Sequence, residues 1–172
     1  MHTLILGGAR SGKSALAERL ASSSAREVVY LATAQALDEE MAARIAHHRA
    51  RRPAQWQCVE APLALADALR AHARSDTCVL VDCLTLWLSN LLAQPAAVLE
   101  RERDALLSTL PQLPGDVLLV SNEVGLGIVP LGELTRRFVD EAGRLHQSLA
   151  ACCERVVFVA AGLPLALKGQ LT

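Results

Sequence analysis

Aromatic residues are scarce in this sequence, and positive charge is not in surplus. Phe, Trp and Tyr make up 3% of the 172 residues, and the formal net charge at pH 7 is −1. Proteins that bind single-stranded nucleic acid stack its bases on aromatic rings, and nucleic-acid binding in general requires a basic surface. The composition therefore argues against a nucleic-acid partner.

Long hydrophobic runs are missing as well. Asp82 interrupts the run Cys78–Leu88, and Gly162 and Pro164 interrupt the run Val156–Leu167. A membrane-spanning helix needs about 18 consecutive apolar residues. The N-terminus has neither the basic flank nor the cleavage site of a signal peptide. We therefore expect no membrane span and no secretory leader.

The five cysteines form no C-x-x-C pair, and their number is odd. Cys78 lies inside an apolar run, and Cys152 and Cys153 are adjacent. This pattern disfavours both a zinc site and a disulfide framework. Buried thiols in a cytoplasmic protein are the simpler interpretation.

Short apolar segments alternate with longer segments of helical character. The predicted strands are Thr3–Leu6, Val28–Ala32, Cys78–Val81, Val117–Ser121 and Val156–Ala160. The predicted helices are Ser14–Ser23, Asp38–Arg51, Leu63–Arg74, Leu84–Leu92, Ala96–Leu110 and Leu131–Cys153. The strands show no polar alternation, as expected where both faces of a parallel sheet are covered. We predict one α/β domain over residues 1–172, with three layers, a mostly parallel central sheet and ligands at the carboxyl ends of its strands.

The first predicted strand leads into GGARSGKS, Gly7–Ser14, which matches the phosphate-binding P-loop G-x-x-x-x-G-K-[ST]. The glycines let successive N–H groups converge, and the following helix adds its unsatisfied N-terminal amides. Lys13 is one of only two lysines against 15 arginines. It is placed to reach the β- and γ-phosphates, and Ser14 to bind Mg²⁺. The alternative, a glycine-rich turn without a ligand, fits this setting poorly.

The run Cys78–Asp82 has the pattern of a second nucleotide-binding strand, four apolar residues closed by an acid. In P-loop proteins this acid holds Mg²⁺ beside the P-loop hydroxyl. The alternative is that Asp82 caps the following helix. Because a complete P-loop lies upstream, we favour Asp82 and Ser14 as the pair that holds Mg²⁺.

The predicted helix Asp38–Arg51 contains two adjacent histidines. On a helical wheel His48 shares the face of Met41 and Ile45, whereas His47 shares the face of Glu40, Arg44 and Arg51. Two guanidinium groups disfavour protonation of a nearby imidazole, so His47 should be neutral and nucleophilic. The simpler alternative is a solvated, arginine-rich helix face with an incidental histidine.

The segment SNEVGLGIVP, Ser121–Pro130, follows a predicted strand and so belongs to the ligand edge of the sheet. Its glycines, its acid Glu123 and its closing proline indicate a constrained loop. Local chemistry does not assign a role to Glu123.

Three segments together, GGARSGKS, ALDEEMAARIAHHRARRP and SNEVGLGIVP, resemble the bifunctional adenosylcobinamide kinase / adenosylcobinamide-phosphate guanylyltransferase family of cobalamin biosynthesis. The resemblance runs from Leu4 to the Leu165–Lys168 tail. It implies a RecA-like P-loop NTPase fold, a homotrimer, and the substrates ATP, GTP, adenosylcobinamide and adenosylcobinamide phosphate, with Mg²⁺. It also implies that His47 carries GMP from GTP to adenosylcobinamide phosphate, which yields adenosylcobinamide-GDP.

The residues that we expect at the site fall into three groups. His47 and Lys13 are the catalytic residues, and Ser14 and Asp82 hold the metal. Arg44 supports His47 from the same helix. The expected nucleotide-binding set is Gly7, Gly8, Ala9, Arg10, Ser11, Gly12, Lys13, Ser14, Thr33, Ala34, Gln35, His48, Arg49, Arg51, Glu60 and Asp82.

Two other function classes share the P-loop. A small-molecule kinase without a covalent intermediate would use Lys13, Ser14 and Asp82 but would leave His47 without a role. A GTPase switch would need the guanine-reading motif N-K-x-D, and the most similar string, Asn122–Gly125, has Glu in place of Lys. A D-x-x-G string at Asp140–Gly143 lies within a predicted helix. We therefore consider the switch the weaker alternative.

Overall fold

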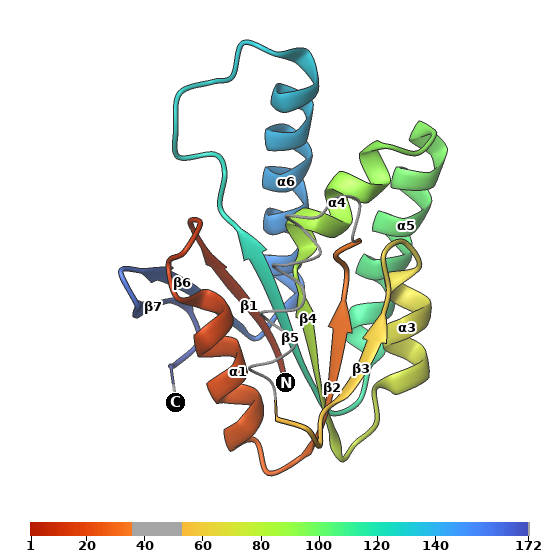
Figure 1. Ribbon diagram of the computed structural model, residues 1–172, viewed down its shortest axis with the longest axis vertical. Coiled ribbons are helices and arrows are strands. Elements are labelled where there is room, and N and C mark those ends of the chain that lie inside the picture. The colour runs from red at the N-terminus through yellow and green to blue at the C-terminus, as the bar shows by residue number, and fades with distance from the viewer. Residues whose placement is uncertain (36–52, 172) are drawn as a thin grey trace.

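The computed structural model describes residues 1–35 and 53–171. Their strands form a seven-stranded β-sheet with helices packed on it (Figure 1). The strands are β1 His2–Gly7, β2 Glu27–Ala32, β3 Gln57–Glu60, β4 Thr77–Asp82, β5 Asp116–Asn122, β6 Arg155–Ala160 and β7 Leu163–Lys168. Their order across the sheet is β3-β2-β4-β5-β1-β6-β7. All neighbouring pairs are parallel except β6 and β7. The mostly parallel sheet expected from the sequence is confirmed.

Helices cover both faces of this sheet, as Figure 1 shows. The described helices are α1 Lys13–Ser23, α3 Leu65–His72, α4 Leu84–Leu92, α5 Ala96–Thr109 and α6 Glu133–Cys152, with a 3₁₀ turn at Leu110–Gln112. Within the described ranges, none of these helices is long and apolar enough to cross a membrane.

The buried side chains form two clusters, one on each face. Leu4 and Leu6 of β1 belong to the cluster beneath α3, α4, α5 and α6, whereas Ile5 belongs to the cluster beneath α1. Successive side chains of a strand point to opposite faces, so uninterrupted apolar strands require cover on both. The expected three-layer arrangement follows from this division.

Most predicted elements agree with the structure to within two residues, and α4 agrees at both ends. The predicted helix Asp38–Arg51 lies outside the described residues. Two short strands, β3 and β7, were not predicted. Both lie at the edges of the sheet, where pairing with β2 or β6, more than a local apolar pattern, makes the strand.

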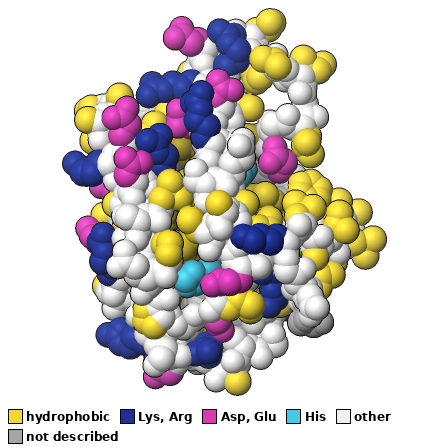
Figure 2. Space-filling model, turned by 180° about the vertical axis from the view of Figure 1, so that it is seen from behind, with side chains coloured by type: hydrophobic (Ala, Val, Ile, Leu, Met, Phe, Trp, Pro, Cys, Tyr) yellow, Lys and Arg dark blue, Asp and Glu magenta, His cyan; other side chains and the backbone are white. Residues whose placement is uncertain are grey.

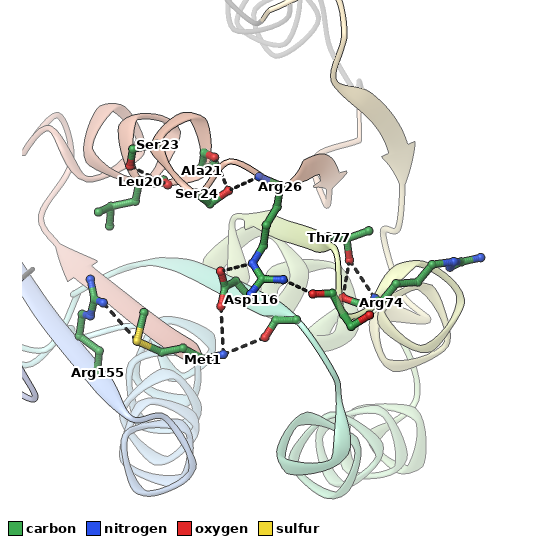
Figure 3. A network of polar contacts seen from close by, with 12 residues as sticks. Met1, Leu20, Ala21, Ser23, Ser24, Arg26, Arg74, Thr77, Asp116 and Arg155 are labelled. Carbon is green, nitrogen blue, oxygen red and sulfur yellow. Dashed lines mark hydrogen bonds and ion pairs between the residues drawn. The ribbon is translucent and has the colours of Figure 1, made fainter.

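The amino-terminal ends of the strands are tied together by Asp116, the first residue of β5 (Figure 3). Its carboxylate accepts hydrogen bonds from the Met1 amino group at 3.0 Å and contacts Arg26 Nε at 2.8 Å. Arg26 also donates to the carbonyl of Ser75 in the turn before β4. These contacts link β1, β4 and β5 at one edge, opposite the edge that carries the candidate site.

The cysteines do not all follow the expectation of burial. Cys78, Cys83 and Cys153 are buried and Cys152 is half-buried, but Cys58 is exposed. Cys58 lies on the edge strand β3, where one side of the chain has no neighbouring strand among the described residues. The expectation was therefore wrong for Cys58.

Candidate active site

The P-loop connects β1 to α1 at the carboxyl edge of the sheet. Arg10 and Gly12 both have positive φ, 56° and 98°, and the helical hydrogen bonds begin with Leu16 N–H donating to Gly12 O at 3.0 Å. The N–H groups in the first turn of α1 therefore have no acceptor within the helix. Free N–H groups at a helix N-terminus form an anion site, which is the geometry that phosphate binding requires.

The loop is packed closely against β6. A Cβ atom on Gly7 would lie 2.4 Å from the carbonyl oxygen of Val159 and 2.6 Å from Ser11 Oγ. Gly162 N–H donates to Ser11 O at 2.8 Å. Ser11 Oγ is buried and has no hydrogen-bond partner among the described residues. Ala9 and Arg10, at the outer turn of the loop, are exposed.

Lys13 lies in this loop with its side chain 8% exposed, and its Nζ donates to Gly8 O at 3.1 Å. Burial lowers the pKa of the Lys13 ammonium group, and the neighbouring Cys83 and Asp82 oppose this change. Asp82, at the end of β4, thus acts electrostatically on Lys13, at the start of α1. The catalytic role of Lys13 and the metal-binding role of Asp82 stay predictions.

Asp82 is the last residue of β4 and is paired in register with Ala32 of β2. Its Oδ2 accepts a hydrogen bond from the Tyr30 hydroxyl at 3.0 Å. The N-cap of α4 is Cys83, and this cap has no side-chain hydrogen bond. The alternative that Asp82 caps the helix is therefore wrong, and its carboxylate faces the α1 side with Tyr30.

Thr33, Ala34 and Gln35 follow β2 at the same edge. Thr33 is fully buried, and its hydroxyl donates to Cys83 O at 2.7 Å and accepts from Cys83 N at 2.9 Å. This side chain therefore joins the ends of β2 and β4. Ala34 is half-buried and Gln35 is exposed.

Glu60 ends β3 and is exposed. Since β2, β4 and β5 lie between β3 and β1, the structure does not bring Glu60 next to the P-loop. At the usual spacing of neighbouring strands, the separation is about 19 Å. A contact of Glu60 with a nucleotide would have to involve the part far from the phosphates.

The remaining predicted residues lie outside the described part of the chain. They are Arg44, His47, His48, Arg49 and Arg51. Their placement relative to the P-loop stays a prediction.

A polar cluster that the sequence did not predict lies at the end of β5. Ser121 Oγ is 2.7 Å from Nε2 of His146 on α6, and His146 Nδ1 is 3.6 Å from Glu123 Oε2. Glu123 Oε1 accepts from Gly125 N–H at 2.6 Å, and Glu123 N–H donates to Gly7 O at 3.0 Å. The cluster therefore lies next to the start of the P-loop. Burial lowers the pKa of His146, although Glu123 acts in the opposite direction.

The part of the chain that the structure describes contains no group of three or more His, Cys, Asp or Glu side chains suited to a metal ion. The predicted magnesium ligands are Ser14 and Asp82, together with the substrate's own oxygens. Both donors are oxygen atoms, which Mg²⁺ prefers, and Mg²⁺ commonly takes only one or two protein ligands.

Comparison with solved structures supports the fold. The chain superimposes on a Pyrococcus horikoshii OT3 protein, PH0250, with a TM-score of 0.57 and 8% identity, covering 98% of this chain and 86% of the other. For the RadB recombinase the TM-score is 0.51, the identity 18%, and the coverage 91% and 73%. At these identities the likeness concerns the fold alone, which is α/β and RecA-like as predicted.

Comparison with curated protein sequences identifies the family. The chain is 64% identical over 171 residues to the "Bifunctional adenosylcobalamin biosynthesis protein CobP" of Pseudomonas aeruginosa, with 99% of each chain covered. It is 40% identical to the Salmonella typhimurium protein CobU, which has the same descriptive name, over 98% of this chain and 100% of the relative. The family model "Cobinamide kinase / cobinamide phosphate guanyltransferase" matches residues 3–167. With its P-loop and acidic strand end in place, the chain belongs to the cobinamide kinase / cobinamide phosphate guanyltransferase family.

Proposed function

We propose that this protein phosphorylates adenosylcobinamide with ATP or GTP and then transfers GMP from GTP to the product. The observation that carries the proposal is the match of residues 3–167 to the family, joined to a P-loop whose buried Lys13 donates to Gly8 O. The result would be adenosylcobinamide-GDP, a late intermediate of cobalamin biosynthesis.

In the kinase step the hydroxyl oxygen of adenosylcobinamide attacks the γ-phosphorus of the nucleotide. The new O–P bond forms as the bond to the β-phosphate bridging oxygen breaks, the nucleoside diphosphate leaves, and the hydroxyl proton passes to solvent. Lys13 and the N–H groups at the start of α1 stabilise charge on the phosphates. Ser14 and Asp82 would hold Mg²⁺, which supplies charge neutralisation when it is bound.

In the guanylyl step the His47 imidazole attacks the α-phosphorus of GTP. An N–P bond forms, and pyrophosphate leaves into the same cradle of Lys13 and P-loop amides. A phosphate oxygen of adenosylcobinamide phosphate then attacks this phosphorus, which frees His47. His47 lies outside the described part of the chain. The support for its role is therefore the sequence pattern and the family.

The test is incubation with GTP labelled at the α-phosphate. We expect a covalent label that is acid-labile and base-stable, as a phosphoramidate is. His47→Ala should abolish it, and His72→Ala is the matched control that should keep it, because His72 ends α3 and is not among the expected site residues. Active kinase without any covalent label would instead support the simple small-molecule kinase.

We also propose that the protein works in the cytoplasm as a homotrimer. Its cysteines form no disulfide in the described residues, which include all five, and this suits a reducing compartment. Hydrophobic side chains are exposed on β7, on the segment between β5 and α6 and in the first turn of α6, and Figure 2 shows yellow side chains on that side of the molecule. The exposed residues are Leu126, Ile128, Val129, Leu131, Leu134, Leu163, Leu165 and Leu167. Patches of this kind favour self-association, and sedimentation analysis would measure the number of subunits.

A further inference from the structure

The cluster of Ser121, Glu123 and His146 plays no part in the steps above, yet it lies next to the P-loop, and two of its members are buried. His146 is 7% exposed and Ser121 is 1% exposed. Burying a polar group costs free energy of folding unless the group is hydrogen-bonded. A buried polar cluster therefore suggests a functional role.

The hydrogen positions in this cluster follow from its acceptor. A carboxylate accepts hydrogen bonds but donates none, so the arrangement favours the tautomer with the proton on His146 Nδ1, which lies 3.6 Å from Glu123 Oε2, within ion-pair range but beyond a hydrogen bond. In the neutral imidazole Nε2 is then the acceptor, and the Ser121 hydroxyl donates to it across 2.7 Å. Ser121 thereby sets the tautomer and orientation of the ring, and the ring presents an N–H group to Glu123.

The cluster is not a nucleophilic triad, because Ser121 is buried within β5 and a substrate cannot reach its hydroxyl. The accessible member is Glu123, whose side chain is 22% exposed. Any action of the cluster on a substrate must therefore pass through the Glu123 carboxylate.

The alternation of side chains along the strands separates Glu123 from the metal-binding candidates. On β5, Val117 and Leu119 face the α6 side of the sheet. Ser121 and Glu123 follow at the same two-residue spacing, and both contact His146 on α6. On β4, Leu80 faces the α1 side, and Asp82 continues that row. Lys13 and Asp82 thus serve the phosphates on one side of the sheet edge, while Glu123 lies on the other.

A carboxylate repels phosphate but accepts a hydrogen bond from a hydroxyl group. We propose that Glu123 binds and orients the hydroxyl group of the phosphoryl acceptor, and that His146, backed by Ser121, is the positioning residue that holds this carboxylate. The inference rests on the proposed kinase activity, since that step has a hydroxyl acceptor.

The test is steady-state phosphorylation of adenosylcobinamide by the full-length protein, with acceptor and ATP varied separately. Glu123→Gln removes the charged acceptor and should lower kcat/KM for adenosylcobinamide about 10-fold or more. The KM for ATP should change less than about twofold, since Lys13 and the P-loop are untouched.

Two substitutions of His146 separate positioning from general stability. The amide nitrogen of Asn lies near the place of Nδ1, whereas that of Gln lies near the place of Nε2. His146→Asn should therefore keep the donor to Glu123 and stay within about threefold of the wild-type kcat/KM, whereas His146→Gln should match Glu123→Gln. Melting temperatures should fall for both, since each leaves part of the cluster unpaired.

His2 offers a matched control, because it is 5% exposed and its ring contacts Leu113 O at the opposite edge of the sheet. His2→Gln should lower the melting temperature without changing kcat/KM for the acceptor. Equal losses in His146→Asn and His146→Gln, or an unchanged Glu123→Gln, would overturn the inference. Wild-type protein that does not phosphorylate adenosylcobinamide at all would overturn the proposed function instead.

Discussion

The hydroxyl of Tyr30 donates a hydrogen bond to Oδ2 of Asp82 across 3.0 Å. Tyr30 is 2% exposed, and it lies on β2, the strand next to that of Asp82. The contact occupies one carboxylate oxygen and restricts the rotation of the group, so that Oδ1 remains for a metal or its water. Such second contacts orient a ligand before the ion arrives.

Tyr30→Phe should therefore weaken magnesium-dependent nucleotide binding without abolishing it. We expect the Mg²⁺ concentration for half-maximal nucleotide binding to rise about 10-fold, in the range found for outer contacts of metal ligands. Calorimetry of ATP binding at a series of Mg²⁺ concentrations measures it, with Asp82→Asn as the stronger variant. An unchanged Mg²⁺ dependence in Tyr30→Phe would show that the contact is structural only.

Gly7→Ala should destabilise the folded protein, even without nucleotide. The new Cβ would meet the Val159 carbonyl oxygen at 2.4 Å, and backbone atoms cannot retreat as a side chain can. We expect a loss of about 1–3 kcal/mol in the free energy of unfolding, as for other overpacked sites. Gly8→Ala is the control, because a Cβ there has no atom within 4 Å. Urea unfolding of both variants should show a clear difference, and equal midpoints would contradict the described packing.

His146 should make stability depend on pH. Burial lowers its pKa in the folded state below the usual value near 6.5, so the unfolded chain binds the proton more readily. Stability from this group is thus complete above about pH 6.5 and is lost as pH falls toward the folded pKa, with a slope of at most about 1.4 kcal/mol per pH unit.

The measurement is urea unfolding of wild type and His146→Asn between pH 7.5 and pH 5. All other ionisable groups are the same in both proteins, so only the difference between the two curves reports on His146. We expect wild type to lose more stability than the variant. Parallel curves would mean that His146 titrates alike in the folded and unfolded chains.

The cysteines should differ widely in reactivity. Burial raises the pKa of the Cys78 thiol to about 11 and that of Cys153 to about 12, and it also raises the pKa of Cys83. The thiolate is the reactive form, so these three should react slowly with a thiol reagent at pH 8. The exposed Cys58 should react first. Mass spectrometry of partly labelled protein identifies the site, and Cys58→Ser should remove the fast phase. Early labelling of a buried cysteine would contradict the prediction.

Much of the fold could be predicted from local patterns. Short apolar runs indicated β1, β2, β4, β5 and β6, because strands covered on both faces need apolar residues at nearly every position. Strands β3 and β7 could not be found in this way. On β7, exposed Leu163, Leu165 and Leu167 belong to a strand only because β6 pairs with it.

The candidate site likewise has one part that could be predicted from the sequence and one part that could not. GGARSGKS could be predicted as a P-loop because phosphate binding dictates its residue types and spacing. The metal-binding role of Asp82 stays a prediction. The hydrogen bonds of Thr33 to Cys83, which lies 50 positions away, and of His146 to Ser121, 25 positions away, have no local signature. In the sequence, His146 is only one polar residue of an amphipathic helix, and nothing nearby marks it as part of a site.

The sequence by itself therefore indicated a nucleotide-phosphate site and the family, because both are encoded in short contiguous motifs. Only the tertiary structure decided which groups meet at the carboxyl edge of the sheet. It brought Tyr30 to Asp82 and His146 to Glu123, and it separated Glu60 from the P-loop. The physical reason is that strand order and helix packing arise from burial summed over the whole chain, which is not a property of any one segment.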